Sequence, residues 1–309
     1  MALTTIVVGV DLSATSDQAL ERAVGLAVQH HAKLVVVHAQ SADAPIENVS
    51  NDLLKQLGEV SAAVRAESAR RLAEQLAAIK ARGVETELVC RVGAPAELLA
   101  TVAEDRRAEL LVVATHGATG ISRFLLGSVA TSTLRLAPCD VLVCRGPTSA
   151  TGFKRPLVAT DFSAAATRAL THAAVLTDAG ARIEIIHAWQ LPAGSWGATL
   201  LGASRFPWST VRDAVLSSAK TQADKLVAAH ANLGHPLHVE LVQGPAPSVI
   251  THAAEQGGHD LIAIGTHGHS GFRRLLLGSV AESTIRHAPC SVLVAHGENA
   301  GETARFRKQ

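Results

Sequence analysis

The sequence predicts an α/β fold made of two tandem, doubly wound domains, each with a five-stranded parallel sheet. Three observations predict it: an internal repeat, short aliphatic runs that alternate with helical periodicity, and a scarcity of aromatic residues. Six Phe, three Trp and no Tyr leave Val, Leu, Ile and Ala to fill the cores, as in buried parallel strands covered by helices on both faces. A length of 309 residues suits two domains of about 150 each.

The repeat is strongest in residues 115–139 and 266–290, where 17 of 25 positions are identical at a constant offset of 151. Shorter matches extend it toward the beginning of each half. They pair 6–13 with 156–163, 34–39 with 183–188, and 110–114 with 261–265. We interpret the chain as a duplication of one domain.

The expected elements alternate between strand and helix. In the first half we expect strands near 5–10, 34–39, 86–91, 110–114 and 141–144, and helices near 16–30, 59–82, 95–106 and 124–136. In the second half we expect strands near 156–160, 183–188, 237–242, 261–265 and 292–295. This alternation indicates βαβ units with right-handed crossovers and therefore a doubly wound parallel sheet.

The domain boundaries follow from composition. We expect domains at 1–147 and 153–297, a linker at 145–155 that contains Gly, Pro, Ser and Thr, and a flexible tail at 298–309. The segments 40–58 and 189–210 are expected to be long and irregular, typical of lids or partner-binding surfaces. The second contains three Trp, which could pack on a helix or stack on a ligand.

Charge and cysteine usage limit the classes of function. With 28 basic and 27 acidic residues the net charge is +1, which gives no broad attraction to nucleic acid or to anionic membranes. No apolar run approaches the roughly 18 residues that a membrane span needs. The four cysteines form no CxxC pair, and the chain starts directly with a strand, so we expect a cytoplasmic protein.

A glycine frame follows the fourth strand of each half. In the second half the frame consists of Gly265, Gly268 and Gly278-Ser279, with nine residues between Gly268 and Gly278. The first half has the same frame at Gly117 and Gly127, with Ala114 in the first position. Glycine lets backbone N–H groups approach an anion and accepts positive φ. A helix that begins beside such a loop is a phosphate site, although tight turns and close packing would also use these glycines.

An aspartate follows the first strand of each half, Asp11 in VGVDLS and Asp161 in VATDFS. Ligands of doubly wound sheets bind at the carboxyl ends of the strands, where the strand order reverses. A carboxylate there can accept hydrogen bonds from an adenine or a ribose. The alternative is a helix cap, a role that Ser13 and Ser163 could also fill.

These motifs resemble the universal stress proteins in their tandem form, over essentially the whole chain up to about residue 297. The ATP-binding branch of that family carries G-x2-G-x9-G-(S/T), which the second half matches completely and the first half matches except at Ala114. The resemblance implies the strand order 3-2-1-4-5 and one ATP per domain, accompanied by Mg²⁺ or Mn²⁺. It also implies that the two last strands meet in an intrachain pseudo-dimer, and a homodimer is a further expectation.

The resemblance assigns base and ribose contacts to Asp11, Ala39, Asp161 and Ala188, and phosphate contacts to the glycine frames. The full set of expected nucleotide-binding residues is Gly9, Asp11, Ala39, Ala114, His116, Gly117, Arg123, Gly127, Ser128 and Val129 in the first domain, and Asp161, Ala188, Gly265, His267, Gly268, Arg274, Gly278, Ser279 and Val280 in the second. Because of Ala114, the first site is expected to bind more weakly.

Several other residues allow two interpretations. His38 and His187 end the second strands and could be core histidines or ligand contacts, and Arg123 and Arg274 could reach phosphates or face solvent. Cys139 and Cys290 occupy equivalent places and fit a repeated packing position better than redox chemistry. We expect neither a metal site nor a catalytic residue in the chain.

We expect an ATP-binding stress sensor or regulator with little or no hydrolysis and an unidentified protein partner. A slow ATPase, or a partner-binding protein that uses another adenine nucleotide, is the alternative. The sequence has no GxxxxGK[ST] loop, which argues against conventional P-loop hydrolysis.

Overall fold

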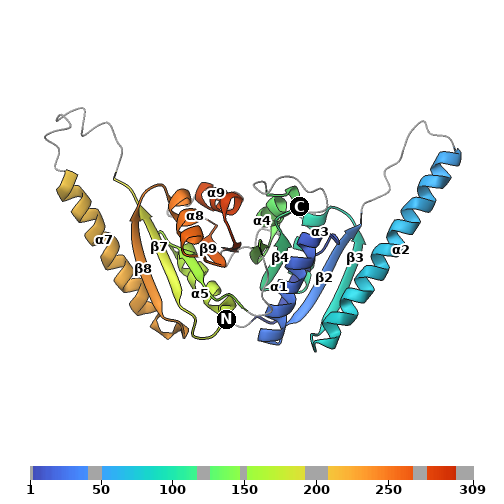
Figure 1. Ribbon diagram of the computed structural model, residues 1–309, viewed down its shortest axis with the longest axis horizontal. Coiled ribbons are helices and arrows are strands. Elements are labelled where there is room, and N and C mark those ends of the chain that lie inside the picture. Colours follow the sequence, from blue (N-terminus) through green and yellow to red (C-terminus); the bar gives the residue numbers. More distant parts are fainter. Residues whose placement is uncertain are drawn as a thin grey trace, which may run out of the picture. The chain divides into compact units, whose positions relative to one another are not determined.

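The computed structural model of the protein describes residues 3–40, 51–116, 126–146, 152–191, 208–266 and 277–296. The chain divides into two compact units, of which the first extends to Gly152 and the second begins at Phe153. Figure 1 shows that each unit is a sheet with helices packed on it.

The first unit alternates strand and helix throughout its described length. Its elements are β1 (Thr5–Gly9), α1 (Ala14–His30), β2 (Lys33–Gln40), α2 (Asn51–Ala81), β3 (Thr86–Val92), α3 (Pro95–Asp105), β4 (Leu110–Ala114), α4 (Ser128–Leu136) and β5 (Asp140–Cys144). The strand order is β3-β2-β1-β4-β5, and every pairing is parallel.

The second unit repeats this plan. Its elements are β6 (Pro156–Ala159), α5 (Ala164–Leu176), β7 (Ile183–Trp189), α7 (Trp208–Ala229), a short 3₁₀ helix (Ala231–Leu233), β8 (Leu237–Gln243), α8 (Ala246–Gln256), β9 (Leu261–Gly265), α9 (Ser279–His287) and β10 (Ser291–Ala295). The order β8-β7-β6-β9-β10 is the same as in the first unit, again with parallel pairs. The predicted doubly wound α/β class and strand order are confirmed.

The central strands are buried on both sides, which is why they are aliphatic at almost every position. Val7 and Val8 of β1 and Leu111 and Val112 of β4 have no exposed surface. Helices cover both faces of such a sheet, so neither face can tolerate a polar side chain without a partner. None of the helices within the described ranges is long and apolar enough to cross a membrane.

In each unit a carboxylate accepts hydrogen bonds from the backbone at the start of the first strand. Glu109 Oε2 accepts hydrogen bonds from the N–H groups of Thr4 (3.1 Å) and Thr5 (2.8 Å). In the second unit Asp260 accepts from the consecutive N–H groups of Lys154 (2.8 Å) and Arg155 (2.9 Å). The duplication therefore preserves a long-range contact that joins the start of β4 or β9 to the start of β1 or β6.

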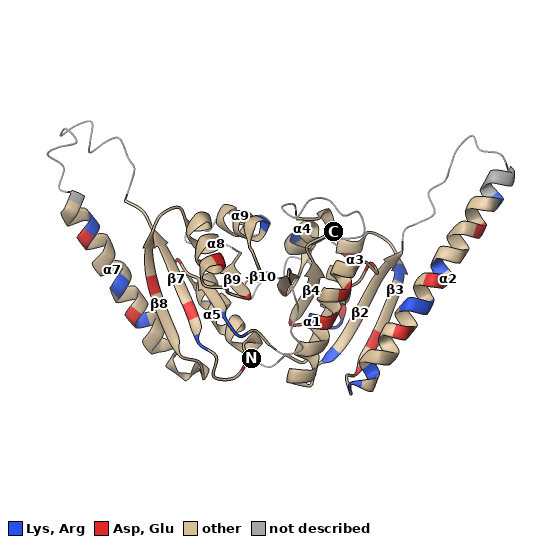
Figure 2. Ribbon diagram, in the orientation of Figure 1, with Lys and Arg blue, Asp and Glu red and all other residues tan. Residues whose placement is uncertain are grey.

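Helix α2 is longer than the sequence predicted. It begins at Asn51, not at 59, so the expected irregular segment 40–58 is wrong from residue 51 onward. Its second half is anchored: Leu72 and Ile79 are buried, and Gln75 donates to Asp17 of α1 (2.8 Å). Residues 55–60 are all exposed, and Figure 2 shows charged residues spaced along the helix, so no burial periodicity marks this part of α2 in the sequence.

Three other boundaries also differ from prediction. Helix α4 begins at Ser128, because Leu126 and Gly127 are not helical, and the predicted start at 124 is wrong. The irregular segment 189–210 is wrong at both ends, since Trp189 closes β7 as a buried side chain and Trp208 opens α7. The linker ends before Phe153, whose side chain is fully buried in the second unit. Trp196 lies outside the described residues.

Candidate functional site

The turn after β1 presents Asp11. Asp11 Oδ1 accepts hydrogen bonds from the N–H (3.1 Å) and the hydroxyl (2.5 Å) of Ser13. Ser13 is the N-cap of α1, and its hydroxyl accepts from the N–H of Ser16 (3.2 Å). Leu12 between them has φ 63°, the left-handed region that a non-glycine residue rarely adopts. The serine is thus the cap, and the aspartate shapes the turn that leads into it.

The second unit builds the same turn from Asp161, Phe162 and Ser163. Asp161 Oδ1 accepts from the Ser163 N–H (3.0 Å), Phe162 has φ 62°, and Ser163 caps α5. Two copies of a left-handed non-glycine residue at equivalent positions show that the surrounding structure enforces this conformation. Backbone strain of this kind clusters at functional sites, where it costs about 1–3 kcal/mol per residue.

The ends of β2 and β7 lie directly beside these turns. His38 Nδ1 is 2.9 Å from the carbonyl oxygen of Val10, and His187 Nδ1 is 2.8 Å from that of Thr160. The next residues, Ala39 and Ala188, are the predicted base contacts and are half-buried. The two histidines are therefore satisfied by main-chain partners.

The glycine loop of each unit is closed at its base by one backbone hydrogen bond. The Gly127 N–H donates to the Thr115 carbonyl (2.8 Å), and the Gly278 N–H donates to the Thr266 carbonyl (2.9 Å). A Cβ on Gly127 would lie 3.1 Å from the Thr115 carbonyl oxygen, so this position needs a residue without a side chain. Its φ is −61°, so this position does not make use of the positive φ that glycine can adopt. Close approach is the reason for a glycine here.

Helices α4 and α9 start immediately after these glycines without a side-chain cap. Gly127 and Gly278 are the N-cap residues, and neither can offer an oxygen to the first N–H groups of the helix. Ser128 and Ser279, the first helical residues, are exposed, as is Val129, while Val280 is half-buried. Uncapped N–H groups and the positive end of the helix dipole together favour an anion at this point.

Two glycines at the strand ends lie close to neighbouring helices. A Cβ on Gly9 would lie 3.0 Å from Leu99 of α3, and one on Gly265 would lie 2.8 Å from the backbone carbon of Ala165 in α5. Ala114 takes the place of Gly265 in the first unit. Gly265 therefore has a packing role against the α5 backbone whether or not it contacts a nucleotide, whereas at Gly9 only the end of the Leu99 side chain would have to move.

The first unit has an additional hydrogen bond where its glycine loop begins. The Thr15 hydroxyl of α1 donates to the His116 carbonyl (2.7 Å), and His116 Nδ1 lies 3.0 Å from the Thr115 hydroxyl. The second unit has Ala165 in the place of Thr15, so it cannot form this bond. The two loops are thus held differently at their entries.

The strand ends and the helix starts lie at the same edge of each sheet, because parallel strands β2, β1 and β4 (and β7, β6 and β9) all end there. The structure thus brings the aspartate turn, the predicted alanine contact and the base of the glycine loop to that edge of each unit. The other predicted contacts, Gly117, Arg123, His267, Gly268 and Arg274, lie outside the described residues.

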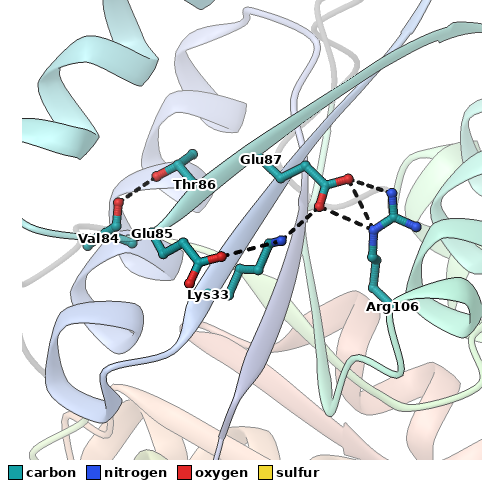
Figure 3. A network of polar contacts seen from close by, with 6 residues as sticks. All are labelled: Lys33, Val84, Glu85, Thr86, Glu87 and Arg106. Atoms are coloured by element: carbon teal, nitrogen blue, oxygen red, sulfur yellow. Dashed lines mark hydrogen bonds and ion pairs between the residues drawn. The ribbon is translucent and has the colours of Figure 1, made fainter.

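An ion-pair network around Glu87, in the described part of the first unit, lies away from this edge. Glu87 of β3 binds Arg106 and Lys33 near the amino ends of the strands (Figure 3), and these interactions lower the Glu87 pKa to about 2. Within the described ranges no group of three or more His, Cys, Asp or Glu residues is arranged to hold a metal ion.

The cysteine thiols are poorly suited to redox chemistry. Burial raises the pKa of the Cys139 thiol, with a further contribution from Asp140 and Glu109. Burial also raises the pKa of Cys144 to about 12, and Cys290 is buried. A thiol that stays protonated is a weak nucleophile, which favours the packing interpretation of these positions.

The sequence did not predict the left-handed residues Leu12 and Phe162 or the Thr15 bond. Their only signal was position: Leu12 and Phe162 directly follow the two aspartates, and Thr15 lies two residues after Ser13. It also left the role of His38 and His187 open. The role of each histidine depends on its hydrogen bond to the carbonyl oxygen of Val10 or Thr160, the residue that follows the neighbouring strand.

Both halves of the chain are similar to known proteins. The model of the universal stress protein family matches residues 3–145 and again residues 152–296. A protein of Staphylococcus aureus (strain USA300) named as a universal stress protein is 33% identical over 147 residues, which cover 45% of this chain and 82% of that protein.

Two solved structures match nearly the full length. A universal stress protein from Archaeoglobus fulgidus has a TM-score of 0.63 at 22% identity, covering 96% of this chain and 97% of its own. A functionally unknown protein from Pseudomonas aeruginosa PAO1 has a TM-score of 0.66 at 14% identity, covering 100% and 98%. Identities this low support similarity of fold alone.

Proposed function

Because the chain belongs to the universal stress protein family, we propose that it is an ATP-binding regulator with one nucleotide site in each unit and little or no hydrolysis. The observation that carries this proposal is the closed glycine loop that leads into an uncapped helix, present in both units. Such a helix start offers N–H donors that its N-cap glycine cannot cap, together with a favourable dipole, to a polyphosphate.

The fit of a phosphate group rests on space as well as on donors. At Gly127 even a Cβ would crowd the Thr115 carbonyl, so glycine keeps the start of α4 free of a side chain that could block a ligand. Ser128 and Ser279 add an exposed hydroxyl at the first helical position of α4 and α9. We propose that the phosphates bind at these residues, with the loop residues Gly117 and Gly268 completing the site.

The base and ribose are proposed to lie against the aspartate turn and the end of the second strand. A carboxylate is an acceptor for ribose hydroxyls or for an adenine amino group. Asp11 and Ala39, and equally Asp161 and Ala188, belong to neighbouring parallel strands or to the turns that follow them. A divalent cation, Mg²⁺ or Mn²⁺, would arrive with the phosphates.

Weak hydrolysis is proposed because the sequence contains no P-loop motif and supplies no partnered nucleophile beside the glycine frames. All four cysteines are free thiols, which suits the proposed cytoplasmic location. A regulator of this kind acts through a partner protein that recognises its nucleotide-bound state.

The test is to purify the protein, denature it and identify any released nucleotide, then to titrate the stripped protein with ATP and measure turnover. We expect two ATP molecules per chain and turnover far below one per second. Release of a different adenine nucleotide would favour the partner-binding alternative, and turnover of many per second would show an enzyme.

Two loop variants locate the sites. Gly117→Arg should remove binding in the first unit and Gly268→Arg in the second, where the loss should include the tighter site. Gly58→Arg is the matched control, because a side chain at Gly58 in α2 meets nothing within 4 Å. Unchanged binding in both loop variants would refute the proposal, and equal losses would refute the difference between the sites.

A further inference from the structure

A histidine hydrogen bond occurs at the same place in both units. His38 Nδ1 lies 2.9 Å from the carbonyl oxygen of Val10, and His187 Nδ1 lies 2.8 Å from that of Thr160. Val10 and Thr160 are the residues directly before Asp11 and Asp161. The bond therefore joins the second strand of each unit to the aspartate turn.

The chemistry of the partner fixes the proton. A carbonyl oxygen can only accept a hydrogen bond, so Nδ1 of each histidine must be the donor. A neutral ring then has its proton on Nδ1 and a lone pair on Nε2. Both histidines are half-buried.

Val10 and Thr160, whose carbonyl oxygens accept these bonds, are also held through their own N–H groups. The Val10 N–H donates to the Val37 carbonyl (2.9 Å), and the Thr160 N–H donates to the Ile186 carbonyl (2.9 Å). The residue before each aspartate is thus attached to the second strand through both of its main-chain groups. Val10 and Thr160 are themselves buried, so an unpaired carbonyl there would be costly.

The histidine bond to the carbonyl of Val10 or Thr160 leads into a strained turn. Leu12 and Phe162, two residues further on, keep left-handed φ values of 63° and 62°. In the second unit the Phe162 ring also packs on the His187 ring, with centroids 4.5 Å apart and planes inclined by 37°. A turn of this kind persists only where its surroundings hold it in place.

We propose that His38 and His187 are positioning residues for nucleotide binding. Each fixes the aspartate turn relative to the strand whose next residue, Ala39 or Ala188, is the other proposed base contact. The base side of each site is then preorganised before the nucleotide arrives, which lowers the ordering cost of binding. This inference rests on the proposed function, because it assumes that ATP binds at the aspartate turn.

The experiment distinguishes the effect of the Nδ1–H donor from the effect of the aromatic ring of each histidine. In an Asn side chain the amide nitrogen stands where Nδ1 stands in His, whereas Phe keeps the ring and removes the donor. The full-length double variants His38→Asn/His187→Asn and His38→Phe/His187→Phe are titrated with ATP by calorimetry. We expect the Asn variant to stay within about twofold of the unmodified protein and the Phe variant to lose about tenfold in affinity at both sites.

His235→Phe is the matched control. His235 Nδ1 also lies 2.9 Å from a carbonyl oxygen, that of Ala181, but at the amino end of β7, away from the proposed site. Loss of the His235 hydrogen bond should change the stability of the protein and leave its ATP affinity unaltered. Melting temperatures of all variants show whether a change in affinity follows general destabilisation, which the Asn and Phe variants would then share with His235→Phe.

A spectroscopic measurement tests the arrangement without nucleotide. Imidazole ¹⁵N spectra of the unliganded protein, with signals assigned by loss in the Asn variants, should show both rings as Nδ1–H tautomers. An Nε2–H tautomer would overturn the inference. So would equal ATP affinities of the Phe variant and the unmodified protein, or equal losses in the Asn and Phe variants. If the unmodified protein bound no ATP, the proposed function would fail and this inference with it.

Discussion

Replacing Glu87 by Gln should destabilise the first unit in a strongly pH-dependent way. The Glu87 carboxylate accepts from Arg106 Nε (3.0 Å) and Nη2 (2.5 Å) and lies 3.0 Å from Lys33 Nζ (Figure 3). These cations come from the end of α3 and the start of β2, so the carboxylate joins three elements. The Arg106 hydrogen bonds, and then that of Lys33, lower the Glu87 pKa from 4.5 to about 2.

The size of the effect follows from that pKa shift. A shift of about 2.5 units corresponds to about 3 kcal/mol between the two protonation states. The Glu87 side chain is 26% exposed, so water screens part of the interaction, and we expect about 1–2 kcal/mol. Because the folded-state pKa is lowered, this stability is complete above about pH 4.5 and is lost as the pH falls through about 2.

The assay is urea unfolding of the unmodified protein and the Glu87→Gln variant between pH 7 and pH 2. All three Trp residues belong to the second half of the chain, so fluorescence reports the second unit, whereas far-UV circular dichroism reports both. The variant should lose stability at pH 7 in the dichroism signal from the first unit, and the difference should vanish near pH 2. Glu240→Gln on the exposed face of β8 is the control.

Two outcomes would refute this reasoning. A Glu87→Gln difference that stays constant down to pH 2 would show that the variant acts through packing and not through charge. No difference at pH 7 would show that solvent screening cancels the ion pairs, as it does for many surface pairs.

Three further substitutions in the second unit can be followed by the same fluorescence measurement. Thr284→Val should stabilise by about 1 kcal/mol, because the Thr284 hydroxyl is fully buried and has no hydrogen-bond partner among the described residues; a loss of stability would reveal one. Gly265→Ala should cost about 1–3 kcal/mol, since the new Cβ would lie 2.8 Å from the Ala165 backbone, and an unchanged unfolding midpoint would contradict that crowding. Ser163→Ala should cost about 1 kcal/mol by removing the cap on the Ala166 N–H, unless water replaces it without penalty.

The sequence predicted the strands well because their burial leaves a clear pattern. Every expected strand was found within one or two residues, as with β4 at Leu110–Ala114. Helix starts were less predictable. The first half of α2 is exposed and contains Gly58, so neither burial nor propensity marks residue 51 as a beginning. The start of α4 depends on the bond from Gly127 to Thr115, which no local pattern encodes.

The residue identities at the candidate site were predictable, but their geometry was not. Asp11 and Gly127 stood out through repetition, and the structure puts both at the carboxyl edge of the sheet. Left-handed φ at Leu12 could not be inferred, since that region favours Gly or Asn. The strand contact of His38 likewise joins residues 28 positions apart, beyond the reach of local patterns.

The difference between the two glycine loops involves a pair of positions. Ala114 and Thr15 in the first unit correspond to Gly265 and Ala165 in the second. Gly265 allows the Ala165 backbone to approach closely, whereas in the first unit the Thr15 hydroxyl reaches the His116 carbonyl (2.7 Å). Changing Ala114 to Gly alone would leave this hydroxyl holding the loop entry.

Only the double variant Thr15→Ala/Ala114→Gly should therefore convert the first site to the second type. In a Gly268→Arg background, which removes the proposed second site, we expect it to bind ATP more tightly than the Ala114→Gly single variant, which should stay close to the unmodified first site. If the single variant alone gained the full affinity, Thr15 would have no part in the difference, and the first position of the glycine frame would act by itself.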